Sequence, residues 1–210
     1  MPRARVDTPQ SKLKRERILN AAVQVFAAKG FHHARVSDVA REAEVADGTI
    51  YIYFKSKDDL LISLFEERME EIVARFEANL AKLESPRDRL YRFIELHLEM
   101  VADAPSLAEV LTVELRQSAK FMREYKAPKF SEYLDLLRAI IEDGQRVGEF
   151  HPEIDANLTR RIIFGALDEL SLYWVSTRRP RETLQQSLEE LWRLCAGGLC
   201  FSPPPEERAP

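Results

Sequence analysis

The segment that decides the fold spans residues 36–57 and reads VSDVAREAEVADGTIYIYFKSK. Its first half places apolar residues at the i, i+3, i+4 and i+7 positions of a two-turn helix: Val36, Val39, Ala40 and Ala43. A turn follows, with Val45 as its buried side chain, and a second short helix over residues 49–54 directs Ile50 and Phe54 inward. Two short helices joined by a tight turn predict a helix-turn-helix.

The outward side of the second helix carries groups that suit a DNA duplex. Short side chains at the start of a recognition helix allow it to approach base edges, and hydroxyls and cations bind phosphates. We therefore expect Tyr53 and Lys57 to contact phosphates, and Thr49 and Tyr51 to lie at a phosphate or at the groove edge. A pair of tyrosines is more often half-buried and structural. Here the order Gly-Thr-Ile-Tyr-x-Tyr-Phe-Lys-x-Lys over residues 48–57 favours DNA contact.

The rest of the chain is predicted to be helical as well. Apolar residues recur at helical spacing in almost every segment, glycine is scarce with 7 residues of 210, and no convincing alternating strand pattern is present. Gly30 is expected to end the first helix, and Ser56 with Asp59 to cap the fourth. We expect an all-α fold of nine helices: about 11–29, two short helices within 36–54, 56–83, one between Pro86 and Ala104, 106–118, 128–147, 155–177 and 181–199.

Charge is distributed unevenly along the chain. The formal net charge is −4, but residues 1–60 carry 11 Lys and Arg against 8 Asp and Glu, or +3, and the other 150 carry 20 against 27, or −7. A basic head on an acidic body has the sign expected of a DNA-binding protein. Cys195 and Cys200 are too few for a disulfide framework or a zinc site, and are expected to be small buried residues. Without a long apolar run or a signal-peptide core, a cytoplasmic protein with no membrane partner is expected.

The segment that opens this section resembles the TetR family of one-component repressors. The resemblance rests on Val39-Ala40-x-x-Ala43-x-Val45-x-x-Gly48-Thr49-Ile50-Tyr51-x-Tyr53-Phe54-Lys55-Ser56-Lys57-x-x-Leu60 and is dense over residues 14–65. It implies a homodimer that binds a palindromic double-stranded DNA operator and is released by an effector. It also implies a helix-turn-helix DNA-binding domain over residues 1–56 with a flexible arm at 1–10, an effector-binding and dimerisation domain over 57–202, and a disordered tail at 203–210.

Two places depart from the family pattern. Arg35 stands where a hydroxyl residue usually caps the helix, and the hydroxyl appears instead at Ser37, so the cap is left open and Arg35 is expected at a phosphate or a guanine edge. Ala46 and Asp47 stand where a serine and a basic or small residue are common. We expect Asp47 to cap the recognition helix, with a cytosine amine as its alternative partner, and Ala46 to meet a thymine methyl. The expected DNA-binding residues are Arg35, Ser37, Ala46, Asp47, Gly48, Thr49, Tyr51, Tyr53 and Lys57.

The stretch 162–175 is apolar almost all round, which predicts a helix covered on two sides. With the last helix it is expected to form an intermolecular four-helix bundle around a twofold axis. Closure of the monomer core is the alternative. The expected dimerisation residues are Phe164, Leu167, Trp174, Leu188 and Trp192.

Helices between residues 86 and 177 carry enough apolar and aromatic side chains to line a long ligand pocket. Charged residues set among them are expected to form a polar network in or beside this pocket, with an internal salt bridge as an equal alternative. The expected effector-binding residues are Phe93, His97, Leu111, Glu114, Leu115, Arg116, Tyr133, Phe164 and Asp168.

Segments 45–51, 61–65, 111–118 and 164–169 resemble the fatty-acid-degradation repressors of the family. That resemblance implies a long-chain acyl-coenzyme A (acyl-CoA) as effector, relief of repression of β-oxidation genes, and no cofactor. An apolar tunnel would hold the acyl chain, and cations at its mouth would bind the phosphates. Two clusters are candidates for the cations, although each is more often a solvated surface: Lys120, Arg123, Lys126 and Lys129, or Arg178, Arg179 and Arg181.

Three other functions stay open at this point. A pocket with Glu114, Asp168 and Trp174 would also suit a cationic xenobiotic and a regulator of efflux. A protein-docking module would use the helix-turn-helix without the steep salt dependence of DNA binding. An enzyme is not expected, because the sequence has no metal-ligand spacing, nucleophile elbow or glycine-rich phosphate loop. The histidines concerned are His32, His33, His97 and His151.

Overall fold

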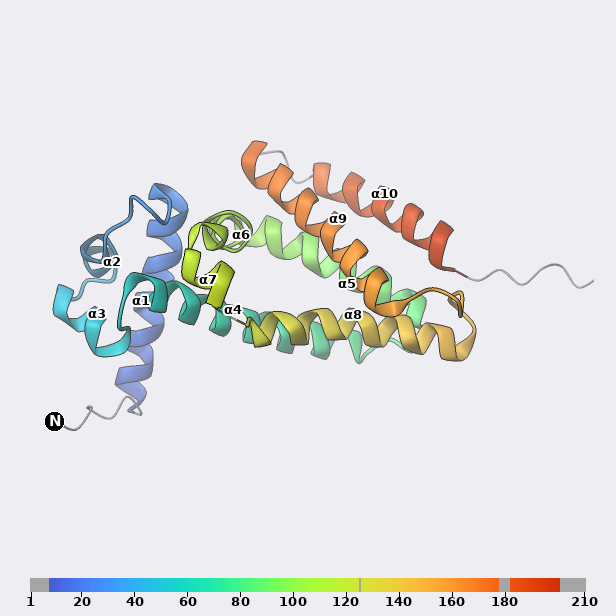
Figure 1. The fold of residues 1–210 in the computed structure, drawn as a ribbon, viewed down its shortest axis with the longest axis horizontal. Coiled ribbons are helices and arrows are strands. Elements are labelled where there is room, and N and C mark those ends of the chain that lie inside the picture. Colours follow the sequence, from blue (N-terminus) through green and yellow to red (C-terminus); the bar gives the residue numbers. More distant parts are fainter. Residues whose placement is uncertain (1–7, 125, 178–181, 201–210) are drawn as a thin grey trace, which may run out of the picture. The chain divides into compact units, whose positions relative to one another are not determined.

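The computed structural model describes residues 8–124, 126–177 and 182–200. The all-α fold predicted from the sequence is confirmed: within these residues the regular elements are ten α-helices, one of them a six-residue turn, and one 3-10 helix. An isolated bridge between Phe150 and Cys200 is the one β pairing of the described chain. In order (Figure 1) the elements are α1 Pro9–Lys29, α2 Val36–Glu42, α3 Asp47–Tyr53, α4 Lys57–Leu80, α5 Pro86–Asp103, α6 Pro105–Thr112, η1 Glu114–Gln117, α7 Ala119–Glu124, α8 Pro128–Val147, α9 Ala156–Thr177 and α10 Glu182–Leu199.

Two of the predicted helix ends are confirmed by their capping bonds. Gly30 follows α1 with a φ of 76°, a conformation that favours glycine, and its N–H donates to the Phe26 carbonyl over 2.9 Å. Ser56 caps α4 by accepting from the Asp59 N–H over 3.1 Å. The Asp59 carboxylate in turn accepts from the N–H of Lys55 over 2.7 Å, one residue before the cap.

The single helix predicted over residues 106–118 is wrong. It breaks into α6, η1 and α7, with Val113 at the junction of the first two. The Thr112 hydroxyl donates back to the Ala108 carbonyl over 2.8 Å, and the β-branched Thr112 and Val113 are poor residues for continuing a helix. The break places Glu114 at the start of η1, where it meets the N-terminal part of the chain.

The helices form two compact units. Unit 1 contains the residues up to Met69 together with Ala104–Ala127, and unit 2 contains Glu70–Asp103 together with the residues from Pro128 onward. This division differs from the boundary at residue 56 expected from the sequence, because the segment from α6 to α7 packs with the N-terminal helices and α4 contributes residues to both units.

In unit 1, α1 packs against α2 and α6, and its Ile18, Leu19 and Phe26 are fully buried. In unit 2, α5 contacts α8, α9 and α10, and α8 also contacts α9. Phe150, which follows α8, packs its buried ring directly onto Gly144, where a larger residue would overlap it. Both thiols are free; Cys195 is buried as expected and Cys200 is half-buried.

Candidate functional site

The helix-turn-helix is formed by α2 and α3, with the predicted residues inside. Val39, Ala40, Ala43, Ile50 and Phe54 are all buried, as their helical spacing predicted. The turn between the helices contains Glu44 in a left-handed conformation with φ of 50°, and Val45 after it is half-buried. This packing leaves the opposite side of α3 to solvent.

The exposed side of α3 carries two large side chains that do not pack in the core of the protein. Tyr51 is 58% exposed and Ile52 is 61% exposed. Thr49 and Tyr53 are half-buried. Of the other predicted DNA-binding residues, five are exposed: Arg35, Ser37, Ala46, Asp47 and Gly48. The helix-turn-helix therefore presents hydroxyls, an aromatic ring and an aliphatic side chain on a basic head.

The cap of α2, left open by the sequence, is provided by Asp38 and not by a hydroxyl. Its carboxylate accepts from the N–H of Arg35 over 3.0 Å, whereas the Arg35 guanidinium has only donors and cannot cap. Asp38 also pairs with Lys29 over 2.8 Å and Arg41 over 2.5 Å. The Lys29 ammonium, followed by the Arg35 N–H, lowers the pKa of Asp38 to about 2.

Asp47 does not cap the recognition helix. The N-cap of α3 is Ala46, which makes no side-chain capping bond, and Asp47 is already the first helical residue. A carboxylate in the first turn still interacts favourably with the helix dipole. The expectation failed because the helix begins one residue earlier than the spacing of Asp47 and Gly48 suggested.

The two predicted phosphate-binding side chains have different surroundings. The Tyr53 hydroxyl lies 3.1 Å from the Ser11 hydroxyl, near the start of α1. The Lys57 ammonium donates to three main-chain carbonyls, those of Phe31, His32 and Ala34, so its three protons are all engaged. Lys55, two residues earlier, is exposed and was not among the predicted contacts. Its place in the motif was the only sequence signal for it.

Unit 2 contains a buried chain of hydrogen bonds centred on His97 of α5. The Ser171 hydroxyl of α9 donates to the Leu167 carbonyl over 2.7 Å, so at 3.1 Å it must accept from His97 Nε2. His97 Nδ1 is then the acceptor for the Tyr133 hydroxyl of α8 at 2.7 Å. Burial lowers the pKa of His97 to about 4 and raises the pKa of Tyr133 well above its ordinary value. The imidazole is held neutral, with its proton on Nε2.

Aromatic rings surround the hydrogen bonds of His97. Tyr133 lies 5.0 Å from Phe93 and 5.2 Å from Phe76, centroid to centroid, and Phe164 lies 4.9 Å from Phe130. Phe93 is fully buried, whereas Phe130 and Phe164 are half-buried. Four predicted effector residues, Phe93, His97, Tyr133 and Phe164, are thus brought together in the core of unit 2. Asp168 is half-buried on α9 of the same unit.

The remaining predicted effector residues belong to unit 1. Leu115 is buried and Leu111 half-buried, whereas Arg116 is exposed on η1. The Glu114 carboxylate is buried and accepts from the N–H of Phe31, in the loop after α1. Glu114 lies in unit 1 and Asp168 in unit 2, and the polar network expected around one pocket stays a prediction.

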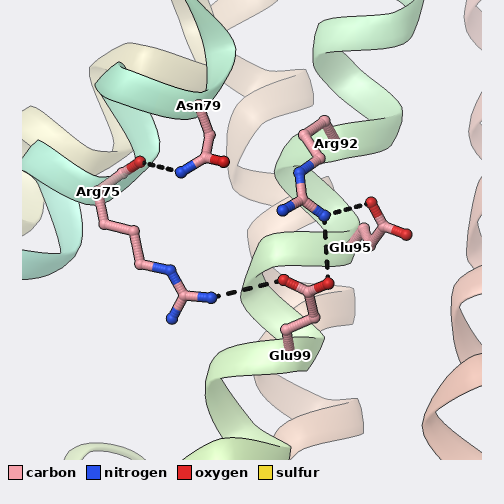
Figure 2. Close-up of polar contacts among 5 residues, drawn as sticks. All are labelled: Arg75, Asn79, Arg92, Glu95 and Glu99. Atoms are coloured by element: carbon pink, nitrogen blue, oxygen red, sulfur yellow. Dashed lines mark hydrogen bonds and ion pairs between the residues drawn. The ribbon is translucent and has the colours of Figure 1, made fainter.

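A cleft of about 340 Å³ lies between α5 and α10 of unit 2. The two glutamates that line it are paired with arginines (Figure 2). Arg92 lies 2.5 Å from Glu95 and 3.2 Å from Glu99, and Arg75 lies 3.5 Å from Glu99. Carboxylates already paired in this way are weak partners for a cationic ligand. The full lining is Glu95, Leu98, Glu99, Ala102, Leu184, Gln185 and Leu188, which includes none of the predicted effector residues.

Of the five predicted dimerisation residues, two are buried in the protomer and three are half-buried. Leu167 is 0% exposed and Leu188 is 2% exposed, so they belong to the core of unit 2, which was the alternative left open. Phe164 and Trp192 are half-buried, with Trp192 5.3 Å from Tyr91, and Trp174 is half-buried. The large apolar side chains that α9 and α10 expose are Leu158, Ile162, Tyr173 and Leu194. These exposed side chains differ from the predicted dimerisation residues, and dimerisation through α9 and α10 stays a prediction.

The cation clusters considered for phosphate binding are only partly described. Lys129 pairs with Glu132 over 2.9 Å, and Lys120 and Lys126 are exposed. The Arg123 side chain and residues Arg178, Arg179 and Arg181 lie outside the described part of the structure, as do most of the predicted N-terminal arm and the predicted tail. Among the described residues, no group of three or more His, Cys, Asp or Glu is placed to hold a metal ion. None of the described helices is long and apolar enough to cross a membrane.

Comparison with known proteins identifies the family. Residues 18–64 match the sequence family of bacterial regulatory proteins, tetR family, and residues 65–198 match the YsiA-like protein, C-terminal region. The chain is 37% identical, over 188 residues, to the fatty acid metabolism regulator protein of Bacillus subtilis (strain 168), covering 90% of this chain and 97% of that protein.

Two solved structures of fatty acid degradation regulators are similar in sequence and in fold. FadR from Bacillus halodurans aligns with a TM-score of 0.81 at 36% identity, over 88% of this chain and 98% of that one. FadR from Bacillus subtilis in complex with stearoyl-CoA aligns with a TM-score of 0.78 at 37% identity, over 84% and 96%. These relatives are regulators and not enzymes. The chain belongs to the TetR family of ligand-responsive bacterial transcriptional regulators.

Proposed function

We propose that the protein is a repressor that binds a palindromic operator as a homodimer and is released from it by a long-chain acyl-CoA, so that fatty-acid degradation genes are expressed when substrate is present. One observation carries the choice of effector: FadR from Bacillus subtilis, 37% identical over 96% of its chain, has been solved with stearoyl-CoA bound. We propose that it acts in the cytoplasm, where it meets its DNA.

The exposed side of α3 supports the DNA-binding part of the proposal. Tyr51 and Ile52 are solvent-exposed on a helix of only seven residues, where a buried position would otherwise stabilise the fold more. Thr49, Tyr53 and the exposed Lys55 supply hydroxyls and a cation for phosphates. We assign the DNA-binding role to residues 1–56, and effector binding and dimerisation to residues 57–202.

The outward sides of α9 and α10 support a homodimer. The exposed side of α9 carries Leu158, Ile162, Gly165 and Tyr173, with the charged Glu169 between the last two, and Leu194 is 74% exposed on α10. No side chain fills the space beside Gly165, Gly197 or Gly198, so a partner helix can approach the backbone closely. Exposed apolar side chains on two adjacent helices are typical of an interface that a second copy covers.

The aromatic core of unit 2 supports the effector part. Phe76, Phe93, Phe130, Tyr133 and Phe164 form one cluster of rings, of which Phe130 and Phe164 are half-buried. We propose that the acyl chain enters among these side chains, which requires them to change rotamer. Phe93, His97, Tyr133, Phe164 and Asp168 stay our proposed effector contacts, and Leu111, Leu115 and Arg116 stay predictions.

Fluorescence anisotropy with a labelled DNA duplex tests the whole proposal. The duplex carries the sequence that the purified protein selects from a random pool at low salt, and affinity is followed as salt rises and as stearoyl-CoA is added. We expect steep weakening with salt, because phosphate contacts release counterions, and release of the DNA by stearoyl-CoA. Coenzyme A without an acyl chain and acetyl-CoA are the matched controls and should leave the complex intact.

Other results point elsewhere. If no duplex is selected, or if affinity is insensitive to salt, the protein is not an operator-binding repressor. If a cationic dye releases the DNA and stearoyl-CoA does not, the regulator responds to a xenobiotic and the acyl-CoA assignment is wrong.

A further inference from the structure

The loop between α1 and α2, residues 30–35, is held from two sides by charged side chains of unit 1. It connects Gly30, at the end of α1, to Arg35, the N-cap of α2. The Ala34 N–H donates to the Gly30 carbonyl over 3.0 Å and closes the loop on itself. The course of this loop therefore determines where α2, and the helix-turn-helix that follows it, begins.

Lys57, at the start of α4, binds the main-chain carbonyls of this loop. Its ammonium donates to Phe31 over 2.6 Å, to Ala34 over 3.1 Å and to His32 over 3.3 Å, and it lies 4.5 Å from the centre of the Phe31 ring. An ammonium has three protons, and three carbonyls accept them. In this arrangement Lys57 is committed to the protein backbone.

Glu114, in η1, binds the same loop through an N–H. Its carboxylate accepts from the Phe31 N–H and is only 5% exposed. A Cβ at Gly30 would lie 3.6 Å from this carboxylate, so the carboxylate also packs against the glycine that ends α1. Phe31 is thus held at its N–H by Glu114, and at its carbonyl and its ring by Lys57.

The segment that carries Glu114 is joined to the other unit at both ends. Residues 104–127 belong to unit 1, but they follow directly on Asp103 at the end of α5 and lead directly into Pro128 at the start of α8, both of unit 2. Further contacts tie the segment to the N-terminal helices: Ser118 donates to Asp58 over 2.6 Å, and the rings of Phe121 and Phe65 lie 5.1 Å apart.

We infer that Glu114 and Lys57 are positioning residues for operator binding: together they clamp Phe31 and set the start of α2 so that α2 and α3 fit the DNA. Glu114 makes this clamp depend on residues 104–127, the segment continuous in the chain with α5 and α8. The inference rests on the operator binding proposed above and adds residues that do not touch DNA. An unclamped loop would have to be ordered when DNA binds, which lowers affinity without removing a DNA contact.

The test uses the full chain and the labelled duplex selected by the wild-type protein. Glu114→Ala and Lys57→Met should each raise the Kd for the duplex by about tenfold or more, since each removes hydrogen bonds that involve a charged group. Glu114→Gln keeps an oxygen that can accept from Phe31 and should stay within about threefold of wild type. Val110→Ala is the matched control: it removes fully buried apolar volume from α6, should lower Tm, and should leave Kd within about twofold.

Salt dependence separates positioning from direct contact. A lysine that binds a phosphate contributes about one to the slope of log K against log salt. Lys57→Met should therefore leave the wild-type slope unchanged, whereas Lys55→Met, at an exposed neighbour, should reduce it by about one.

Four outcomes would overturn the inference. The first is that both clamp variants bind the duplex as tightly as wild type. The second is that Val110→Ala loses affinity in parallel with Tm. The third is that Lys57→Met reduces the salt slope. The fourth is that the wild-type protein selects no duplex at all, in which case operator binding itself fails and the inference fails with it. In the first three outcomes the wild type still binds DNA, so only the positioning role of Glu114 and Lys57 fails.

Discussion

Lowering the pH from 7 to about 4.5 should destabilise the protein by about 2 kcal/mol through His97 alone. Its imidazole is 6% exposed, and its two ring nitrogens are engaged by Tyr133 and Ser171. Because Ser171 gives its proton to the Leu167 carbonyl, His97 must be neutral with the proton on Nε2. A second proton, on Nδ1, would oppose the donating hydroxyl of Tyr133 and put an uncompensated charge in an apolar core.

The magnitude follows from the pKa in the two states. Burial lowers the pKa of folded His97 to about 4, against about 6.5 for a solvated histidine in the unfolded chain. The unfolded state binds the proton first as pH falls, so the stability is fully present above about pH 6.5 and is lost progressively down to the folded pKa near 4. Integrated from pH 7 to about 4.5, the loss in the free energy of unfolding is about 2 kcal/mol.

The assay compares wild type with His97→Phe, which keeps an aromatic ring at this position and cannot titrate. Urea unfolding is followed by far-UV circular dichroism at both pH values and at one fixed protein concentration, since association also adds to stability. Wild type should lose about 2 kcal/mol more than His97→Phe over this range. Tyr133→Phe, which leaves Nδ1 without a donor, should cost about 1–3 kcal/mol at pH 7.

Two results would refute the reasoning. If wild type and His97→Phe lose the same stability between the two pH values, His97 is not held neutral by the fold. If nuclear magnetic resonance shows His97 titrating near pH 6.5 in the folded protein, the imidazole is solvated and the deduced chain of hydrogen bonds is wrong.

Three further predictions concern other parts of the molecule. Gly144→Ala should lower the free energy of unfolding in urea by about 1–3 kcal/mol, because the added methyl overlaps the fully buried Phe150 ring. This overlap outweighs a helix-propensity gain of about 1 kcal/mol, and an increase in stability would contradict the packing. Ile162→Asp, on the exposed side of α9, should shift sedimentation from dimer to monomer while far-UV circular dichroism shows that the helices stay folded, and a mass unaffected by the change would exclude this side as the interface. Tyr51→Ala should weaken duplex binding while changing stability by less than about 0.5 kcal/mol, and an unchanged Kd would remove Tyr51 from the DNA-contacting residues.

Much of the fold could be predicted from local patterns. Helical spacing located almost every helix to within a few residues, and Gly30 and Ser56 act at helix ends as their chemistry predicts. The inward residues of the helix-turn-helix, such as Val39 and Ile50, follow from periodicity alone. These features depend on residues three to eight positions apart, so the order of residues is sufficient to read them.

The candidate sites were predicted less well, because their geometry depends on which helices are neighbours. Periodicity showed that Leu167 and Leu188 lie on apolar sides of their helices, but not that those sides face the protomer core while Ile162 and Leu194 face solvent. The N-cap of α3 was predicted at Asp47 and lies at Ala46. Several short sequences can begin a helix at neighbouring positions, so local sequence leaves the first residue uncertain by one or two positions.

Charged and polar side chains show most clearly which features the sequence determines and which only the tertiary structure decides. The sequence suggested a phosphate as the partner of Lys57, and it placed Glu114 among apolar residues and suggested a ligand as its partner. Tertiary packing brings both to Phe31, 26 and 83 residues away from it in the chain. His97 likewise gains its partners only when α5, α8 and α9 pack together. A buried polar group must be satisfied by whatever donor or acceptor the fold brings near it, and that partner is not encoded by local spacing.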